Sequence, residues 1–173
     1  AEAGGKVVVV ARDEEKLAEV RKKIQDAGGF AKTYSCDITD LAANDKLAKD
    51  ILKEFGHVDV LVNNAGRSIR RSLALSYDRF HDFERTMQLN YFACVRLTMN
   101  LLPSMTARKS GHVINVSSIG VLTNAPRFSS YVASKAALES FARCAASEFH
   151  DEGVQFTIIN MPLVRTPMIA PTK

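Results

Sequence analysis

A tyrosine and a lysine four residues apart form the pair in this chain best suited to moving a proton. Tyr131 and Lys135 lie in the stretch Tyr-Val-Ala-Ser-Lys, within a helix predicted to continue to about His150. Positions i and i+4 share one face of a helix, so both side chains can point into the same small volume. A fixed cation favours the phenolate and lowers the tyrosine pKa from its usual value of about 10, which makes it a usable acid or base near neutrality. The spacing alone also fits a solvated lysine one turn below a helix-capping tyrosine.

A serine precedes this pair at the end of a predicted strand. The strand from about His112 to Val116 runs into Ser117 and Ser118, and a loop then leads to the helix of Tyr131. A hydroxyl at a strand end could hold a carbonyl oxygen while the phenol protonates it. Ser118, Tyr131 and Lys135 together predict proton-relay chemistry.

The elements around these residues alternate between strands and helices. The β-branched run of residues 7–10 is typical of a strand buried on both faces, and Asp13 offers a cap for the helix that follows. Further segments continue the pattern: strands at about 30–35, 58–62, 112–116 and 154–159, and helices at about 41–55, 83–102 (with a kink or boundary at Pro103) and 131–150. Such alternation predicts one α/β domain over residues 1–173, with a doubly wound parallel sheet and right-handed crossovers.

Composition narrows the class of protein. The chain has 173 residues, 46% hydrophobic and 24% charged, with a net charge of +4. Its basic residues are spread along the chain rather than forming the stripe that a nucleic-acid surface would need. Three separated cysteines, and the lack of a signal-peptide pattern or of 18 consecutive apolar residues, predict a cytoplasmic protein with no membrane span. Four isolated histidines show no metal-ligand spacing, so we predict no metal.

Four motifs occur in an order and at spacings that resemble those of the short-chain dehydrogenase/reductase family. They are the strand end Asn63-Asn64-Ala65-Gly66, the helical Asn90, the strand-end Ser118 and the Tyr131-x-x-x-Lys135 pair, within a resemblance that runs from about Lys6 to Met168. The resemblance implies a Rossmann-type fold and a carbonyl reduction by hydride transfer from a nicotinamide cofactor.

The resemblance also implies a role for each of these side chains. By it, Tyr131 exchanges the proton of the substrate oxygen, and Lys135 lowers the tyrosine pKa and hydrogen-bonds the nicotinamide ribose. Ser118 positions the oxygen, and Asn90 anchors a relay water.

Further cofactor contacts follow from the same resemblance. Arg12 stands after the first strand, where an arginine accommodates the NADP 2′-phosphate, so NADP(H) is favoured over NAD(H) although Asp13 follows. Asp37 would accept from the adenine amino group. The remaining implied contacts are Ile38, Asn63, Ala65, Gly66, Tyr131, Lys135, Val164 and Thr166. Read without the resemblance, Arg12 and Asp13 are a solvated helix start and Asp37 is a turn or cap residue.

The sequence departs from the family pattern in three places. Met161-Pro162 stands where the family has Pro-Gly. The Gly-rich phosphate loop does not occur, and the family places that loop, with a strand, just upstream of where this sequence begins. The family also has a final helix and strand after its last motif. We therefore expect a longer polypeptide, with a further central strand between the segments at residues 7–10 and 58–62, without which two apolar sheet edges are exposed.

The stretch from Pro162 to Lys173 is similar to the reductase domain of bacterial fatty acyl-CoA reductases, which implies a long-chain aldehyde or acyl-thioester substrate. A 3-oxoacyl-thioester reductase and a hydroxysteroid-type dehydrogenase remain alternatives within the family. A non-catalytic scaffold without a phosphate loop is an alternative of another class, against which Tyr131 and Lys135 in register argue. In the family, the helix near Phe83 and the helix of Tyr131 form a subunit interface, so we expect a homodimer or homotetramer.

Overall fold

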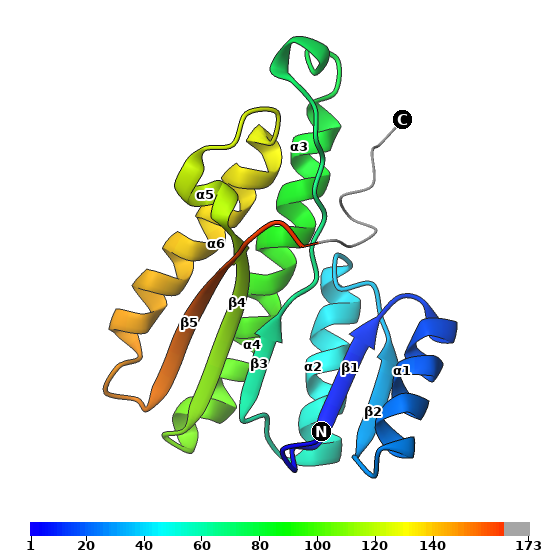
Figure 1. Cartoon of the computed structure of the whole chain (residues 1–173). Helices are drawn as coiled ribbons and strands as arrows, with labels where there is room; N and C mark the ends of the chain where they lie inside the picture. The colour runs from blue at the N-terminus through cyan, green and yellow to red at the C-terminus, as the bar shows by residue number, and fades with distance from the viewer. Residues whose placement is uncertain (165–173) are drawn as a thin grey trace.

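The computed structural model describes residues 1–164, in which strands and helices alternate (Figure 1). The strands are β1 (Val7–Ala11), β2 (Ala31–Ser35), β3 (Val60–Asn63), β4 (Gly111–Ser118) and β5 (Val154–Met161). The helices are α1 (Glu14–Asp26), α2 (Leu41–Phe55), α3 (Phe80–Met87), α4 (Cys94–Ala107), α5 (Ile119–Thr123) and α6 (Ser129–Glu148), with a 3₁₀ turn η1 (Leu73–Leu75) and a π-helix η2 (Gln88–Ala93). The predicted α/β class is confirmed.

The parallel strands form two separate hydrogen-bonded groups rather than one continuous sheet. β1 pairs with β2, and β4 lies between β3 and β5, with every pairing parallel. Figure 1 shows the two groups side by side with their arrows pointing the same way. The break falls between β1 and β3, which is where the family resemblance places an additional strand.

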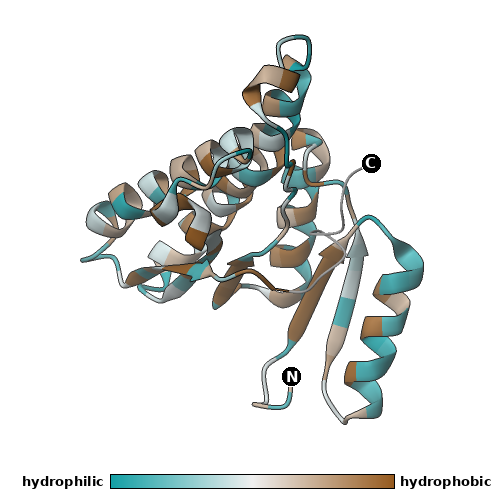
Figure 2. Ribbon diagram, turned by 45° about the horizontal axis from the view of Figure 1, so that its top comes forward, coloured by the Kyte–Doolittle hydropathy of each residue, from teal (hydrophilic) through white to brown (hydrophobic). Residues whose placement is uncertain are grey.

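Helices lie on both faces of the structure: α1 packs against β1 and β2, whereas α4 and α6 pack against one face of the β3–β5 group. From the break between the two groups, β1 and β2 follow one another in one direction, and β3, β4 and β5 follow one another in the other direction. Because parallel crossovers are right-handed, α1 and α4 lie on opposite faces. The core packs α2 and α4 against β3 and β4, and its most deeply buried members include Ala48, Leu101, Met105 and Val113. In Figure 2, β1 is coloured hydrophobic along its length, β2 is mostly pale with a hydrophilic band, and α1 is largely hydrophilic.

Local sequence explains the ends of the first two helices. Asp13 accepts a hydrogen bond from the Lys16 N–H at 3.0 Å, and Asp40 accepts from the N–H groups of the first turn of α2. These carboxylates satisfy donors that a helix start leaves free. Gly56 ends α2 at φ 79°, in the left-handed region that glycine enters without strain.

The long helix predicted from about residue 83 to 102 is interrupted at a different place from the one predicted. The interruption is the π-helix η2 at Gln88–Ala93, and Pro103 lies inside α4 without ending it. Apolar periodicity does not reveal a π turn, because the turn inserts one residue while the flanking faces stay apolar. α5 was also not expected, since its five residues were predicted to be loop.

One face of the three-stranded group carries exposed apolar side chains. Val60 and Val62 of β3 are 50% and 53% exposed, and Ile159 and Met161 of β5 are also exposed. Their neighbours on the opposite face, such as Leu61 and Val113, are buried against the helices. Within residues 1–164, no helix combines the length and apolar character that crossing a bilayer requires.

Candidate active site

The predicted site residues gather at one edge of the strands. Arg12 follows β1, Asp37 and Ile38 follow β2, Gly66 follows β3, and Ser118 ends β4. All five strands are parallel, so their carboxyl ends meet at the same edge. In open α/β sheets, ligands bind outside the carboxyl ends of the strands. The topology therefore brings these residues to the expected binding edge.

Lys135 is almost entirely buried, at 3% exposure. Its Nζ donates to the Val116 carbonyl at 2.7 Å, which ties α6 to β4. Burial lowers the pKa of the Lys135 ammonium, because desolvation disfavours the charged form, and the nearby Cys94 acts in the opposite direction. Cys94 is itself buried, and this burial raises the pKa of its thiol to about 11. Lys135 is thus not the solvated lysine that its spacing alone allowed.

Gly66 lies directly against Asn90 and Lys135. A Cβ added at Gly66 would stand 3.4 Å from Asn90 Oδ1 and 3.5 Å from Lys135 Nζ. Residues from the loop after β3, from η2 and from α6 therefore meet within a few ångströms, although they are far apart in the sequence. Glycine lets a ligand approach the main chain more closely than any other residue, and a lysine donor lies directly behind it, so the residue types present fit a nicotinamide cofactor at this edge.

Asn90 links the loop after β3 to the helix of Tyr131. Its Oδ1 accepts from the Arg67 N–H at 2.8 Å, and its Nδ2 donates to the Arg67 carbonyl at 2.9 Å and to Ser134 Oγ at 2.9 Å. Ser134 in turn donates to the Tyr131 carbonyl at 2.7 Å. The buried amide is therefore fully engaged, and it holds three segments in one arrangement.

Within residues 1–164, the Ser118 hydroxyl donates its hydrogen to no acceptor. Its Oγ accepts from the Gly120 N–H at 3.1 Å and so caps α5. A serine oxygen can accept a hydrogen bond while its own hydrogen is donated elsewhere. Gly120 packs tightly here, because a Cβ on it would lie 3.2 Å from Ser118 Oγ. The hydroxyl is held by its acceptor side and can donate to a carbonyl oxygen.

Tyr131 is half-buried near the start of α6, with its ring edge-on to Phe128 at 6.5 Å between centroids. Because α6 runs without interruption from Ser129 to Glu148, Tyr131 and Lys135 share one face, as their spacing predicted.

Arg12 and Asp37 meet at the outer part of the edge. Arg12 Nη1 lies 3.5 Å from Asp37 Oδ2, and both side chains are substantially exposed. Asp37 Oδ1 accepts from the N–H and the hydroxyl of Thr39, which lowers the Asp37 pKa. Asp13 is committed to capping α1. Arg12 therefore lies at the strand end with its side chain exposed. Asp37 hydrogen-bonds within its own turn, which is the structural role considered for it in the sequence.

Other predicted contacts have different surroundings. The Asn63 side chain points into the interior, where its Nδ2 donates to Asn115 Oδ1 at 2.8 Å and to Thr98 Oγ1 at 3.1 Å. The Ile38 carbonyl accepts from the buried Asn44, and Ala65 is exposed next to Gly66. Val164 is exposed just beyond Pro162, and Thr166 lies outside the described residues.

Several residues that join these segments were not singled out from the sequence. Ser134, Ser117 and Asn160 are hydrogen-bonded around Asn90 and Ser118. Glu139 is a buried carboxylate on α6. A signal for it existed, since it lies four positions beyond Lys135 on the same helical face.

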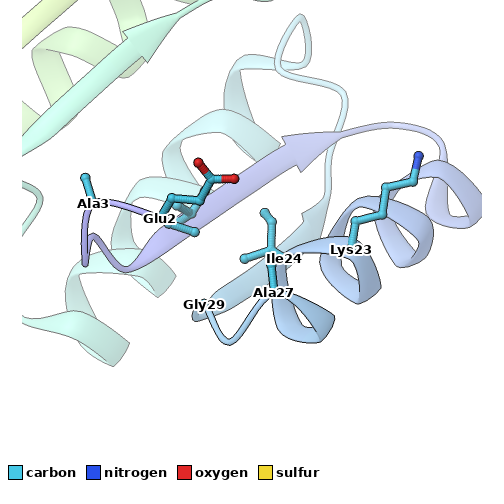
Figure 3. A pocket seen from close by; sticks show the side chains of 8 residues that line it. Glu2, Ala3, Lys23, Ile24, Ala27 and Gly29 are labelled. Carbon is cyan, nitrogen blue, oxygen red and sulfur yellow. The ribbon is translucent and has the colours of Figure 1, made fainter.

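A hollow in the structure lies away from this edge. Its volume is about 500 Å³, and Val7, Lys23, Ile24 and Gly29 contribute to its lining (Figure 3). It sits at the amino ends of β1 and β2, a full strand length of roughly 17 Å from Arg12 and Asp37. It is therefore not part of the candidate site. In the described part of the chain, no group of three His, Cys, Asp or Glu side chains is placed to hold a metal ion.

A family model described as short chain dehydrogenase matches residues 1–173. This chain belongs to the short-chain dehydrogenase family. A relative named fatty acyl-CoA reductase, from Acinetobacter baylyi, is 60% identical over 173 residues, which are 100% of this chain and 59% of that protein. The chain thus spans little more than half the length of this relative.

Two solved structures that are similar to this chain contain bound cofactors. A metagenomic short-chain oxidoreductase in complex with NADP is 32% identical at a TM-score of 0.87, covering 92% of this chain and 72% of that one. A 7 alpha-hydroxysteroid dehydrogenase complexed with NADH is 29% identical at a TM-score of 0.86, covering 92% of this chain and 62% of that one. Of these two structures, one thus holds NADP and the other holds NADH.

Proposed function

We propose that this chain is the core of an NADPH-dependent reductase that acts on long-chain acyl thioesters or fatty aldehydes. The observation that carries the proposal is the meeting of Gly66, Asn90 and the buried Lys135 on the Tyr131 helix, at the strand edge that Ser118 reaches. The 60% identity to a protein named fatty acyl-CoA reductase supports the substrate class.

The chain's own side chains supply the proton chemistry. When bound, a reduced nicotinamide supplies a hydride to a carbonyl carbon. Ser118 donates a hydrogen bond to the carbonyl oxygen, and Tyr131 gives that oxygen its proton as negative charge develops. An aldehyde thereby becomes an alcohol. A thioester becomes a hemithioacetal, whose hydroxyl returns its proton to the Tyr131 phenolate as the carbon–sulfur bond breaks; the products are an aldehyde and a thiolate, which takes a proton from solvent. Lys135 holds a positive charge on the same helical face and favours the tyrosinate that remains.

Asn90 has two tasks in the proposal. Its side chain holds the loop of Arg67 against α6, as its hydrogen bonds indicate. Its main chain lies within the π-helix η2. A π turn breaks the regular i→i−4 ladder, which suits a main-chain carbonyl that accepts from a relay water.

The decisive assay is oxidation of NADPH in the presence of defined carbonyl compounds. It uses the longest polypeptide that the gene encodes, alongside the 173-residue chain. The probes are palmitoyl-CoA, hexadecanal, a 3-oxoacyl thioester and a steroid ketone. Turnover of the first two supports the proposal, while preference for either of the others points to the alternative within the family. NADPH binding is measured separately by fluorescence titration. If neither polypeptide bound NADPH, a non-catalytic scaffold would be favoured.

Arg12 provides the test of cofactor choice. Replacing Arg12 with alanine is expected to raise KM for NADPH about tenfold or more and KM for NADH by less than about twofold, since a hydrogen-bonded ion pair with the 2′-phosphate is lost. Steady-state kinetics with both cofactors measure the two values. Arg21→Ala, an exposed arginine on α1, is the matched control. Equal effects on both cofactors would contradict the assignment.

We also propose that α4 and α6 form a subunit interface. A groove of about 450 Å³ runs between them, and Met99, Pro103, Phe141 and Phe149 contribute to its apolar lining. Met99 is 54% exposed, which is a large apolar area for an outer helix face. The double variant Met99→Asp with Phe141→Asp is expected to sediment at a smaller mass than the parent, and the parent at two or four times the monomer mass. A monomeric parent would refute this interface.

A further inference from the structure

Glu139 of α6 is a buried carboxylate that the proton relay does not use. It is 3% exposed and lies four and eight positions beyond Lys135 and Tyr131. Residues at this spacing follow one stripe of a helix, so Glu139 extends the catalytic face toward the strands. A buried carboxylate is costly unless several donors compensate it, so its partners indicate what it is for.

The carboxylate joins three elements through two atoms. Oε1 accepts from Ser117 Oγ at 2.5 Å and from Asn160 Nδ2 at 2.7 Å. Oε2 accepts from Arg143 at 3.2 Å, and the Arg143 side chain is 62% exposed. Ser117 and Asn160 are register partners in the β4–β5 ladder. Glu139 therefore fastens the ends of both strands to α6.

These contacts surround Ser118 on its main-chain side. Ser117 precedes it directly, and Asn160 Nδ2 also donates to the Ser118 carbonyl at 3.2 Å. The hydroxyl oxygen of Ser118 accepts a hydrogen bond from the Gly120 N–H. The position of that hydroxyl relative to Tyr131 thus depends on how β4 is held against α6. Two clamps hold it, namely Lys135 on the Val116 carbonyl and Glu139 on Ser117 and Asn160.

Charge pairing by itself does not explain a carboxylate here. Arg143 is the cation in contact among the described residues, and its exposure lets solvent screen the pair. An apolar side chain would fill the space at less desolvation cost. What a carboxylate adds is the ability to accept from a hydroxyl and an amide at the same oxygen, which fixes both donors in one geometry.

We propose that Glu139 is a positioning residue for the reaction, which sets the Ser118 hydroxyl in register with Tyr131 and Lys135. The inference rests on the proposed function. Misplacing a catalytic group by about 1 Å can cost a hundredfold in rate while substrate binding changes little. The loss should therefore fall on kcat rather than on KM.

The experiment measures kcat, KM and the isotope effect from NADPH deuterated at the transferred position, in the longest polypeptide the gene encodes. Glu139→Leu is expected to lower kcat about 30- to 100-fold, with KM and the NADPH Kd within about threefold. The isotope effect on kcat should rise, because hydride transfer becomes more rate-limiting. Glu139→Gln, which keeps one acceptor oxygen, should recover kcat to within about tenfold of the parent. The matched control is Glu152→Gln, which changes an exposed glutamate in the turn after α6 and should leave kcat within about twofold of the parent.

A double-mutant cycle keeps the test informative if Glu139→Leu does not fold. Ser117→Ala combined with Glu139→Gln should lose no more activity than the more severe single variant, because both act on one contact. A kcat within about twofold of the parent in a folded Glu139 variant, or a loss matched by equal loss of NADPH binding, would overturn the positioning role alone. A parent polypeptide that reduces none of the carbonyl probes would overturn the proposed function and this role with it.

Discussion

Replacing Tyr131 with phenylalanine is expected to lower kcat for carbonyl reduction at least about a thousandfold while NADPH binding stays within about twofold. The change removes only the phenolic oxygen, which is the proposed proton donor, and general acid catalysis contributes about 10² to 10⁴ in rate. The ring keeps its edge contact with Phe128, so the fold should be retained. Stopped-flow oxidation of NADPH and fluorescence titration give the two quantities.

Tyr77→Phe is the matched control for this prediction. Tyr77 is 88% exposed and lies outside the strand edge, so loss of its hydroxyl should leave kcat unchanged. If Tyr131→Phe retained more than about a tenth of the parent rate, the proton would have to come from another group. A parallel fall in thermal stability would also speak against a purely chemical role.

Replacing Lys135 with methionine is expected to abolish most activity and yet stabilise the fold. The ammonium is 3% exposed and has one hydrogen bond among the described residues, to the Val116 carbonyl. Methionine has a similar length and carries no charge to desolvate, so the buried space stays filled. We expect kcat to fall at least about a hundredfold and the midpoint of thermal unfolding to rise by a few degrees, on the order of 2–6 °C.

The stability gain should depend on pH in one direction. Burial lowers the folded-state pKa of Lys135 below its ordinary value of 10.5, so the unfolded chain binds this proton more tightly. The parent therefore gains stability as the pH rises between the two values. The advantage of Lys135→Met is largest near neutrality and shrinks toward alkaline pH. Urea unfolding of both proteins at several pH values measures this difference. A methionine variant less stable than the parent at neutral pH would show that the bond to Val116 outweighs desolvation.

Local chemistry in the sequence was enough to predict most elements. The helix predicted from Leu41 to Phe55 matches α2, because a capping aspartate begins it and Gly56 ends it. β1 was evident from four consecutive valines. The prediction for the long helix of Asn90 placed its interruption at Pro103, which was wrong. The helix is interrupted instead by the π-helix at Gln88–Ala93, where Asn90 contacts Arg67 and Ser134. Those partners are far away in the sequence, so no local pattern reports them.

The family and the paired side chains of Tyr131 and Lys135 were determined by the sequence alone, because a helical repeat fixes which residues four apart share a face. The tertiary structure decided which other residues join them. It turned Asn63 inward toward Asn115, placed Gly66 against Lys135, and drew Glu139 to Ser117. Each of these contacts joins different elements, so each depends on strand register and on how α6 packs against the sheet. Spacing along one element carries no information about either.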